Sequence, residues 1–469
     1  MRPMNNFRND PVVNQLVATY EAQFGGGEEA YFEAKAYLKI IEFYERDFQY
    51  DKALEVAGHA IAHHSYSAEC YSRKAQLLIG LGKADEALSV LEQAQLFAPS
   101  EPEVALLQAE ALIALERMEE AHAMLEAMKA CANSEQLSDI LLVEALAYEV
   151  EEQHERVYYT LKAAIEADPS NEEALERFGT CIELSRKYEE SVAFHEALLE
   201  DDAYLAQAWF NLGQAHAYLG DYDEAIQAYE YAFLSDENME EAYRECGALC
   251  FELKQYNKAL KCYEELLENF DPDSELFISV GQCYFHLGKY QSALAFYSRA
   301  LQFDPLNDEL FFYMGECYAM EEDLSTAIHF FQKAIQIEDG REDYHAALGH
   351  AYYYCDELEK AEACFRHAVE ITPEDGQYWV KWAVFLLDTG RPDEALEVLE
   401  EAELEAVGPE LMYCRAACLF SSGKRQEAIY WLGEALLEDF TGHRLLFDIL
   451  PALAEDPDVI ALISTYSLE

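Results

Sequence analysis

The sequence has 469 residues, and 92 Asp and Glu against 32 Lys and Arg give a formal net charge of −60. This charge disfavours nucleic acid and anionic membrane surfaces as partners, because both are bound mainly through Lys and Arg. The chain is also 51% hydrophobic and 13% aromatic, which excludes an acidic disordered tail. We therefore expect a folded protein with neutral or basic protein partners.

The N-terminal region predicts neither a signal peptide nor a membrane anchor. Residues 1–24 contain no apolar core of a signal peptide, and the sequence has no apolar run near 18 residues. We therefore expect a cytoplasmic protein without membrane insertion. Residues 1–33 are expected to form an N-terminal cap that holds one amphipathic segment, Val12–Phe24. The three glycines at 25–27 predict a flexible joint after it.

A single alanine position recurs along most of the chain with a spacing of 34 residues, and this indicates internal repeats. Its members are Ala53, Ala87, Ala121, Ala225, Ala259, Ala293, Ala327, Ala361, Ala395 and Ala428, with a last step of 33. Val157 and Ser191 divide the long gap after Ala121 into steps of 36, 34 and 34. Twelve repeat units follow from this register.

Taking the alanine as position 20 of each unit predicts where the units begin. The starts are Ala34, Ala68, Pro102, Ser138, Glu172, Ala206, Glu240, Ser274, Asp308, Glu342, Gly376 and Pro409. Each unit holds two apolar segments with helical periodicity, such as Ala206–Leu219 and Tyr222–Leu234, separated by a short turn. We therefore expect antiparallel helical hairpins, with small residues at positions 8, 20 and 27 against bulky ones at 4, 17 and 24.

The sixth unit carries the residues of a known repeat family. Trp209, Leu212, Gly213, Ala225, Tyr229 and Ala232 stand in the pattern of that family. This pattern resembles the tetratricopeptide repeat. The resemblance implies an all-α, right-handed α-α superhelical solenoid of about twelve tandem repeats over residues 34–442.

The C-terminal residues 443–469 are expected to form capping helices over the last repeat. The apolar residues of 445–450 and 459–463 predict two short helices around Pro451 and Pro457. An outermost repeat has an uncovered apolar face, which such helices would cover. The alternative is that one tail docks a partner or a second copy of the chain.

Metal, cofactor and catalytic chemistry are not expected from the sequence motifs. The closest cysteine spacings, Cys246/Cys250 and Cys414/Cys418, are not CxxC pairs, so reduced, packed thiols are favoured over a redox or metal role. His59 and His63, with His64 beside them, have a spacing that could hold zinc, but no third ligand stands nearby.

The sequence also contains no glycine-rich phosphate loop, HExxH, nucleophile elbow or kinase signature. We therefore expect a protein that is not an enzyme, with no catalytic residue, no metal and no cofactor.

The resemblance implies that the first helix of each hairpin lines a concave groove through positions 2, 5, 6, 9, 12 and 13. It also allows one known activity of the family to be tested, the clamp that holds the C-terminal carboxylate of chaperones. That clamp needs cations and asparagines where this chain has Glu176, Thr180, Glu241 and Glu245, and only Asn211 matches. A chaperone-tail clamp is therefore rejected.

The groove positions are instead mainly aromatic. The candidate partner-binding residues are Phe210, Asn211, Gln214, Tyr218, Phe251, Phe285, Phe312, Tyr313, Tyr353, Tyr354 and Phe420, with Tyr413 beside the last. Together with Glu241, Glu245 and Glu316, these rings suit a neutral or basic amphipathic segment. The alternative is that the rings pack between adjacent first helices or line contacts across superhelical turns.

We therefore expect a non-enzymatic scaffold or adaptor that binds a neutral or basic protein segment in an aromatic, acidic concave groove. Two alternatives stay open: a self-assembling structural or regulatory subunit, which would form a homo-oligomer, and an accessory subunit of an enzyme complex.

Overall fold

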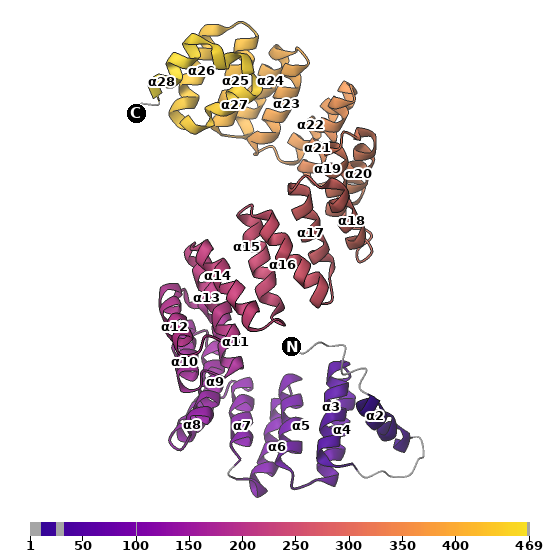
Figure 1. The fold of residues 1–469 in the computed structure, drawn as a ribbon, viewed down its shortest axis with the longest axis vertical. Coiled ribbons are helices and arrows are strands. Elements are labelled where there is room, and N and C mark those ends of the chain that lie inside the picture. The colour runs from indigo at the N-terminus through magenta and orange to yellow at the C-terminus, as the bar shows by residue number, and fades with distance from the viewer. Residues whose placement is uncertain (1–10, 25–31, 100, 467–469) are drawn as a thin grey trace. The chain divides into compact units, whose positions relative to one another are not determined.

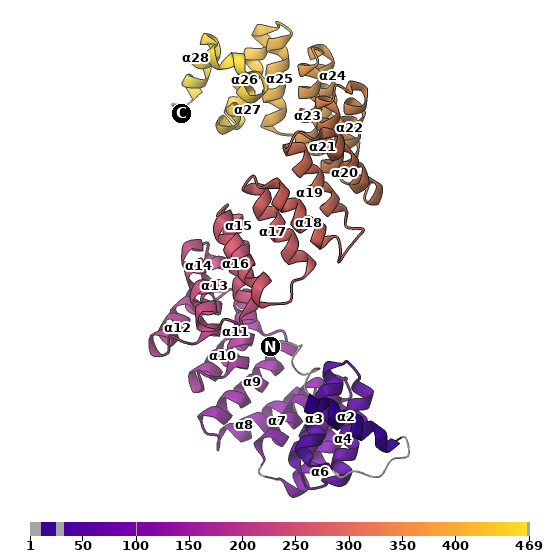
Figure 2. The same ribbon diagram turned by 45° about the vertical axis from the view of Figure 1, so that its right-hand side comes forward.

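The computed structural model describes residues 11–24, 32–99 and 101–466, and all regular structure in these residues is helical. The chain forms two compact units, Met1–Leu249 and Cys250–Glu469. Within each unit, successive helices lie side by side (Figures 1 and 2). The expectation of an all-α helical-repeat solenoid is confirmed. The glycines at 25–27 lie outside the described residues.

The first unit begins with one helix before the pairs. Its helices are α2 (Pro11–Phe24), α3 (Ala34–Arg46), α4 (Tyr50–His63), α5 (Ala68–Gly80), α6 (Ala84–Phe97), α7 (Pro102–Ala114), α8 (Met118–Lys129), α9 (Ser134–Val150), α10 (His154–Ala167), α11 (Glu172–Ser185), α12 (Tyr188–Asp201), α13 (Ala206–Leu219) and α14 (Tyr222–Ser235). The boundary between the units falls within α15 (Glu240–Glu252).

The second unit continues the same alternation and ends in shorter elements. Its helices are α16 (Tyr256–Asn269), α17 (Ser274–His286), α18 (Tyr290–Ala300), α19 (Asp308–Met320), α20 (Leu324–Ile337), α21 (Glu342–Tyr354), α22 (Leu358–Ile371), α23 (Gly376–Asp388), α24 (Pro392–Glu405), α25 (Pro409–Ser421), α26 (Arg425–Glu438), η1 (Phe440–Gly442), α27 (His443–Ile449), η2 (Pro451–Glu455) and α28 (Pro457–Tyr466).

The turn inside each helix pair has the same backbone conformation. Among the described residues, those with positive φ are five glycines, such as Gly220 at 85°, and seven other residues, such as Arg186 at 55°. Every one of them stands at position 15 of the register, two residues before the second helix of its pair. Glycine adopts this left-handed conformation without steric cost, whereas the seven other residues adopt it at a steric cost.

Glycine at position 8 lets the second helix of a pair pack closely on the first. A Cβ added at Gly213 would lie 2.7 Å from the ring of Tyr229, and one at Gly281 would lie 2.3 Å from the ring of Tyr297. Both rings stand at position 24, and both are almost completely buried. The pairing of small position 8 with bulky position 24 therefore has a direct steric cause.

The expected start of the fourth unit is wrong by four residues. Helix α9 begins at Ser134, not at Ser138, and is 17 residues long. Asn133 accepts a hydrogen bond from the Gln136 backbone, and the Gln136 side chain accepts one from the Asn133 backbone. This capping box fixes the earlier start. The extra residues of the longer third unit therefore extend the N-terminus of α9.

Both ends of the described chain pack on the neighbouring helix pair of their own unit. In the first unit, the Tyr44 hydroxyl donates to the Glu21 carboxylate of α2 over 2.9 Å. In the second unit, Leu446 of α27 and Val459 of α28 are completely buried in the core that also contains α25 and α26. No described helix is long and apolar enough to cross a membrane.

Candidate functional site

Asn211 does not present its side chain at an open surface. It is completely buried on α13, where its Nδ2 donates to the Leu175 carbonyl oxygen over 2.7 Å and its Oδ1 accepts from Gln207 over 3.1 Å. The space for this amide comes from Gly179 of α11, whose added Cβ would lie 2.6 Å from the Asn211 Oδ1. Asn211 therefore packs between successive first helices, which corrects its place among the groove residues.

The other predicted groove residues of the first unit differ in exposure. Phe210 is half-buried with its ring 5.6 Å from that of Tyr229, and Gln214 is half-buried. Tyr218 is 45% exposed and stacks on Tyr188 with ring centroids 5.0 Å apart. Burial and a hydrogen bond to Glu183 raise the pKa of Tyr218 to about 12.

In the second unit, Phe251 and Phe285 contact aromatic residues of neighbouring helices. The Phe251 ring lies 5.4 Å from Tyr256 and 5.5 Å from His286, and Tyr256 stacks on His286 at 4.6 Å. The Phe285 ring lies 5.5 Å from that of Tyr290. Both predicted rings are half-buried in these contacts.

Phe312 and Tyr313 pack against rings of adjacent helices. Phe312 of α19 stacks on Tyr344 of α21 at 4.7 Å, and Tyr313 stacks on Tyr297 of α18 at 5.6 Å. The alternative stated for the aromatic residues, packing between adjacent first helices, therefore describes Phe312.

The last predicted rings also differ from one another. Tyr353 is half-buried, edge-on to Phe385 at 5.6 Å, whereas Tyr354 is 71% exposed. Phe420 is half-buried with the Arg425 guanidinium 5.7 Å from its ring. Tyr413 is completely buried, and its hydroxyl donates to the Asp439 carbonyl oxygen over 2.6 Å. Tyr218 and Tyr354 are thus the most exposed of the predicted rings.

The second unit places acids beside these rings. Glu316 is half-buried on α19, and burial together with the nearby charge of Asp343 raises its pKa to about 7. Arg341 pairs with Glu309 and Asp343, each over 3.3 Å. The first helices α19 and α21 therefore carry more carboxylates than this arginine neutralises.

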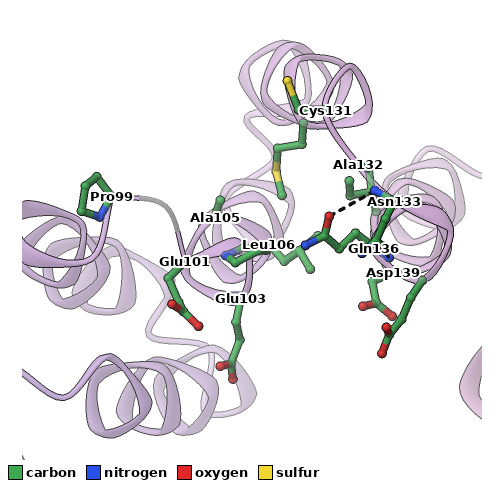
Figure 3. Close-up of a pocket in the computed structure, with 14 residues that line it drawn as sticks. Pro99, Glu101, Glu103, Ala105, Leu106, Cys131, Ala132, Asn133, Gln136 and Asp139 are labelled. Carbon is green, nitrogen blue, oxygen red and sulfur yellow. Dashed lines mark hydrogen bonds between the residues drawn. The ribbon is translucent and has the colours of Figure 1, made fainter.

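The first unit contains a cavity of about 700 Å³ between α7, α8 and α9 (Figure 3). It is lined by Pro99, Glu101, Pro102, Glu103, Ala105, Leu106, Met128, Cys131, Ala132, Asn133, Glu135, Gln136, Asp139 and Ile140. We call it the α7–α9 pocket. Figure 3 shows Glu101 and Glu103 on one side and Asp139 on the other.

The carboxylates around the α7–α9 pocket repel one another. The pKa of Glu103 is raised by burial and by the charges of Glu101 and Glu69. The pKa of Asp139 is raised by burial and then by Glu135 and more distant acids. No basic residue is among the described residues that line the pocket, so a cation entering it would relieve this repulsion.

Sequence reasoning missed the α7–α9 pocket, although one signal pointed to it. The third unit has 36 residues instead of 34, and the lengthened N-terminus of α9 supplies Gln136 and Glu135 to the wall. An irregular spacing marks a joint between repeats that cannot pack like its neighbours.

The three histidines considered for zinc have other partners. The Tyr20 hydroxyl lies 2.6 Å from His59 Nδ1, and the Tyr37 hydroxyl lies 2.7 Å from His63 Nδ1. His64 Nε2 lies 2.8 Å from the Phe32 carbonyl oxygen. These hydrogen bonds hold α2 and α3 to the end of α4.

Comparison with protein families gives one consistent answer. Models described as tetratricopeptide repeat match residues 46–111, 206–238, 238–306, 342–375 and 383–401. The chain is a tetratricopeptide repeat protein. Tetratricopeptide repeats are in general protein-interaction modules, so a role as an interaction scaffold follows at this level.

Solved structures of tetratricopeptide repeat proteins are similar to parts of this chain. YrrB, described as having an unusual peptide-binding site, is 23% identical, with a TM-score of 0.34, and covers 39% of this chain and 95% of its own. A chain of the APC/C hetero-tetramer Cut9-Hcn1 is 14% identical, with a TM-score of 0.35 and coverages of 92% of this chain and 96% of its own. A protein from Parabacteroides merdae is 16% identical, with a TM-score of 0.37 and coverages of 54% and 99%. No curated protein matches the chain.

Proposed function

We propose that this tetratricopeptide repeat protein is a non-enzymatic scaffold that binds a basic, amphipathic segment of a partner protein. The α7–α9 pocket is the observation that carries this proposal, because it joins an apolar lining to an acidic rim. In this proposal the partner's basic side chains lie against the rim and its apolar side chains enter the pocket.

The apolar part of the pocket suits an aliphatic or aromatic anchor. Leu106 of α7, Met128 of α8 and Ile140 of α9 line it. Methionine adapts its shape to different apolar partners. Buried apolar anchors supply most of the binding energy at protein interfaces, while surrounding polar contacts set orientation.

The acidic part of the pocket selects the charge of the partner. Glu101, Glu103, Glu135 and Asp139 contribute carboxylates to the lining. A Lys or Arg of the partner would lie among carboxylates that repel one another, whereas an acidic segment would add to the repulsion.

The exposed rings Tyr218 and Tyr354 are proposed as further contact points. Tyrosine combines a large apolar ring with a hydrogen-bonding hydroxyl and is common at interfaces. The half-buried rings, by contrast, are already used in contacts between helices.

Peptide binding tests the proposal. A fluorescent helical peptide with one face of Leu and the opposite face of Lys is titrated into the full chain. Its affinity is compared with that of the same peptide with Glu in place of Lys. The Lys peptide is expected to bind. The double variant Glu103→Gln/Glu135→Gln should weaken this binding about tenfold or more, because two charge contacts with the peptide are lost.

The matched control is Glu196→Gln/Glu200→Gln, which removes the same charge from exposed positions of α12. It should leave binding nearly unchanged. Equal affinity for both peptides, or equal weakening by both double variants, would reject the pocket as the basic-segment site.

A further inference from the structure

Three metal-ligating side chains of the second unit converge near the start of α21. Asp339 follows α20, His345 lies in the first turn of α21, and His367 lies in α22. One ligand atom from each lies within 4.8 Å of the other two. The two imidazole rings are 4.4 Å apart, nearly perpendicular to each other.

The distance between two of these atoms matches that of ligands on one metal ion. His345 Nε2 lies 3.2 Å from Asp339 Oδ1. Two donors at about 2.0–2.2 Å from a tetrahedral zinc ion are separated by roughly 3.3 Å. The separation of these two atoms therefore suits two ligands of one ion, and the ligand atom of His367, within 4.8 Å of both, would have to move closer to join them.

His367 already has the partner that orients a metal-binding histidine. Its Nδ1 lies 3.1 Å from the Glu370 Oε2, one turn further along α22. If Nδ1 carries the proton and donates to this carboxylate, Nε2 keeps its lone pair for a metal. The carboxylate then fixes the tautomer and makes the imidazole a stronger ligand.

The same two register positions hold packing pairs in other helix pairs. Position 4 and position 26 carry Trp209 with Tyr231, Phe277 with Arg299, and Phe311 with Lys333, at 4.7, 4.2 and 5.3 Å. In the pair α21/α22 these positions are His345 and His367. This pair keeps the ring contact, at 4.4 Å, but makes it from two side chains that can each ligate a metal, beside the carboxylate of Asp339.

We propose that Asp339, His345 and His367 bind a zinc ion, with Glu370 orienting His367. Two imidazoles and a carboxylate are ligands that zinc accepts, with water completing a four-coordinate site. The ion would join the end of α20 to α21 and α22. This site is separate from the α7–α9 pocket and independent of the proposed function.

Zinc titration of the metal-free full chain by calorimetry tests the site, with Co²⁺ absorption as a second readout of coordination. The wild-type chain should bind one more equivalent of Zn²⁺ than His367→Ala, and Asp339→Asn should also lose it. Glu370→Gln should weaken binding about 10- to 100-fold, as removal of an orienting carboxylate does.

The control variant is His329→Ala, which removes an exposed histidine of α20 and should leave the titration unchanged. Circular dichroism confirms that each variant is folded. A purely structural role for His345 is the alternative, because its Nε2 lies 3.1 Å from the Asp339 carbonyl oxygen. Trp379 makes the corresponding contact in its own helix pair, where its Nε1 donates to the Pro373 carbonyl oxygen over 2.8 Å. Equal stoichiometry and affinity in wild type and His367→Ala would leave only this role and overturn the proposal.

Discussion

Glu316 shows how one residue of the first helices is affected by its surroundings. Burial and the charge of Asp343 raise its pKa to about 7, from an ordinary value of 4.5. A carboxyl whose pKa is higher in the folded than in the unfolded state favours folding when it is protonated. Its contribution is fully present below about pH 4.5 and is lost as the pH rises through about 7.

Replacing this carboxyl should therefore stabilise the protein only at high pH. We expect Glu316→Gln to raise the free energy of unfolding by about 1–3 kcal/mol at pH 8 and to have little effect at pH 4.5, since the glutamine cannot ionise. Urea denaturation at the two pH values measures the difference.

Glu120→Gln is the control, because Glu120 is exposed and its hydrogen bond with Arg117 lowers its pKa. This variant should not gain stability at pH 8. The same effect of Glu316→Gln at both pH values would show that the carboxyl is not destabilising when ionised.

At the scale of single residues, the sequence predicted which face of a helix a side chain occupies better than it predicted how exposed that side chain is. Asn211 stands at a groove position, yet it is buried because Gly179 leaves room for its amide beside the Leu175 carbonyl. Such a contact depends on two residues more than 30 positions apart. The cluster around His345 was missed for the same reason, since His367 is distant in sequence and joins it only through the pairing of α21 with α22.

At the scale of the helix pair, packing depends on the absence of a side chain at position 8. Gly281 of α17 faces Tyr297 of α18, and an added Cβ would come 2.3 Å from the ring. Tyr297 is nearly completely buried and also stacks on Tyr313 at 5.6 Å. The ring therefore cannot move away without disturbing α19.

We expect Gly281→Ala to lower the free energy of unfolding by about 1–3 kcal/mol, because overpacking outweighs the gain in helix propensity. Thermal unfolding followed by circular dichroism measures this change.

Gly58→Ala is the matched comparison, since the nearest atom to its added Cβ is the Lys74 Nζ at 4.0 Å. Without a clash, that variant of α4 should gain about 0.5–1 kcal/mol. A stabilising effect of Gly281→Ala would mean that α17 and α18 separate more easily than their packing indicates.

Most of the helix pattern could be predicted because it rests on local spacing. The pair Ala206–Leu219 and Tyr222–Ser235 lies where the apolar periodicity placed it, and the turn at Gly220 has the expected residue. The start of α9 could not be predicted by adding 34, because the capping box at Asn133 and Gln136 overrides the register. The α7–α9 pocket, which depends on this start, was missed with it. The repeat boundaries at residues 34 and 442 stay a prediction.

At the scale of the whole molecule, the net charge of −60 opposes folding and at the same time favours basic partners. Repulsion among like charges destabilises the folded state, whereas attraction to a basic segment speeds and strengthens association. Salt screens both interactions. It should therefore act on folding and on binding in opposite directions.

Raising NaCl from 0.01 to 0.15 M shortens the screening length from about 30 to about 8 Å. We expect the thermal midpoint of the chain at pH 7.5 to rise over this range, while the affinity for the Lys-rich peptide falls. The same salt series near pH 4.3, the isoelectric point of the sequence, is the control for folding, because the net charge there is close to zero and the midpoint should barely change. A midpoint that falls with salt at pH 7.5 would mean that attractive ion pairs, such as Arg425 with Asp456, outweigh the repulsion among the excess acids.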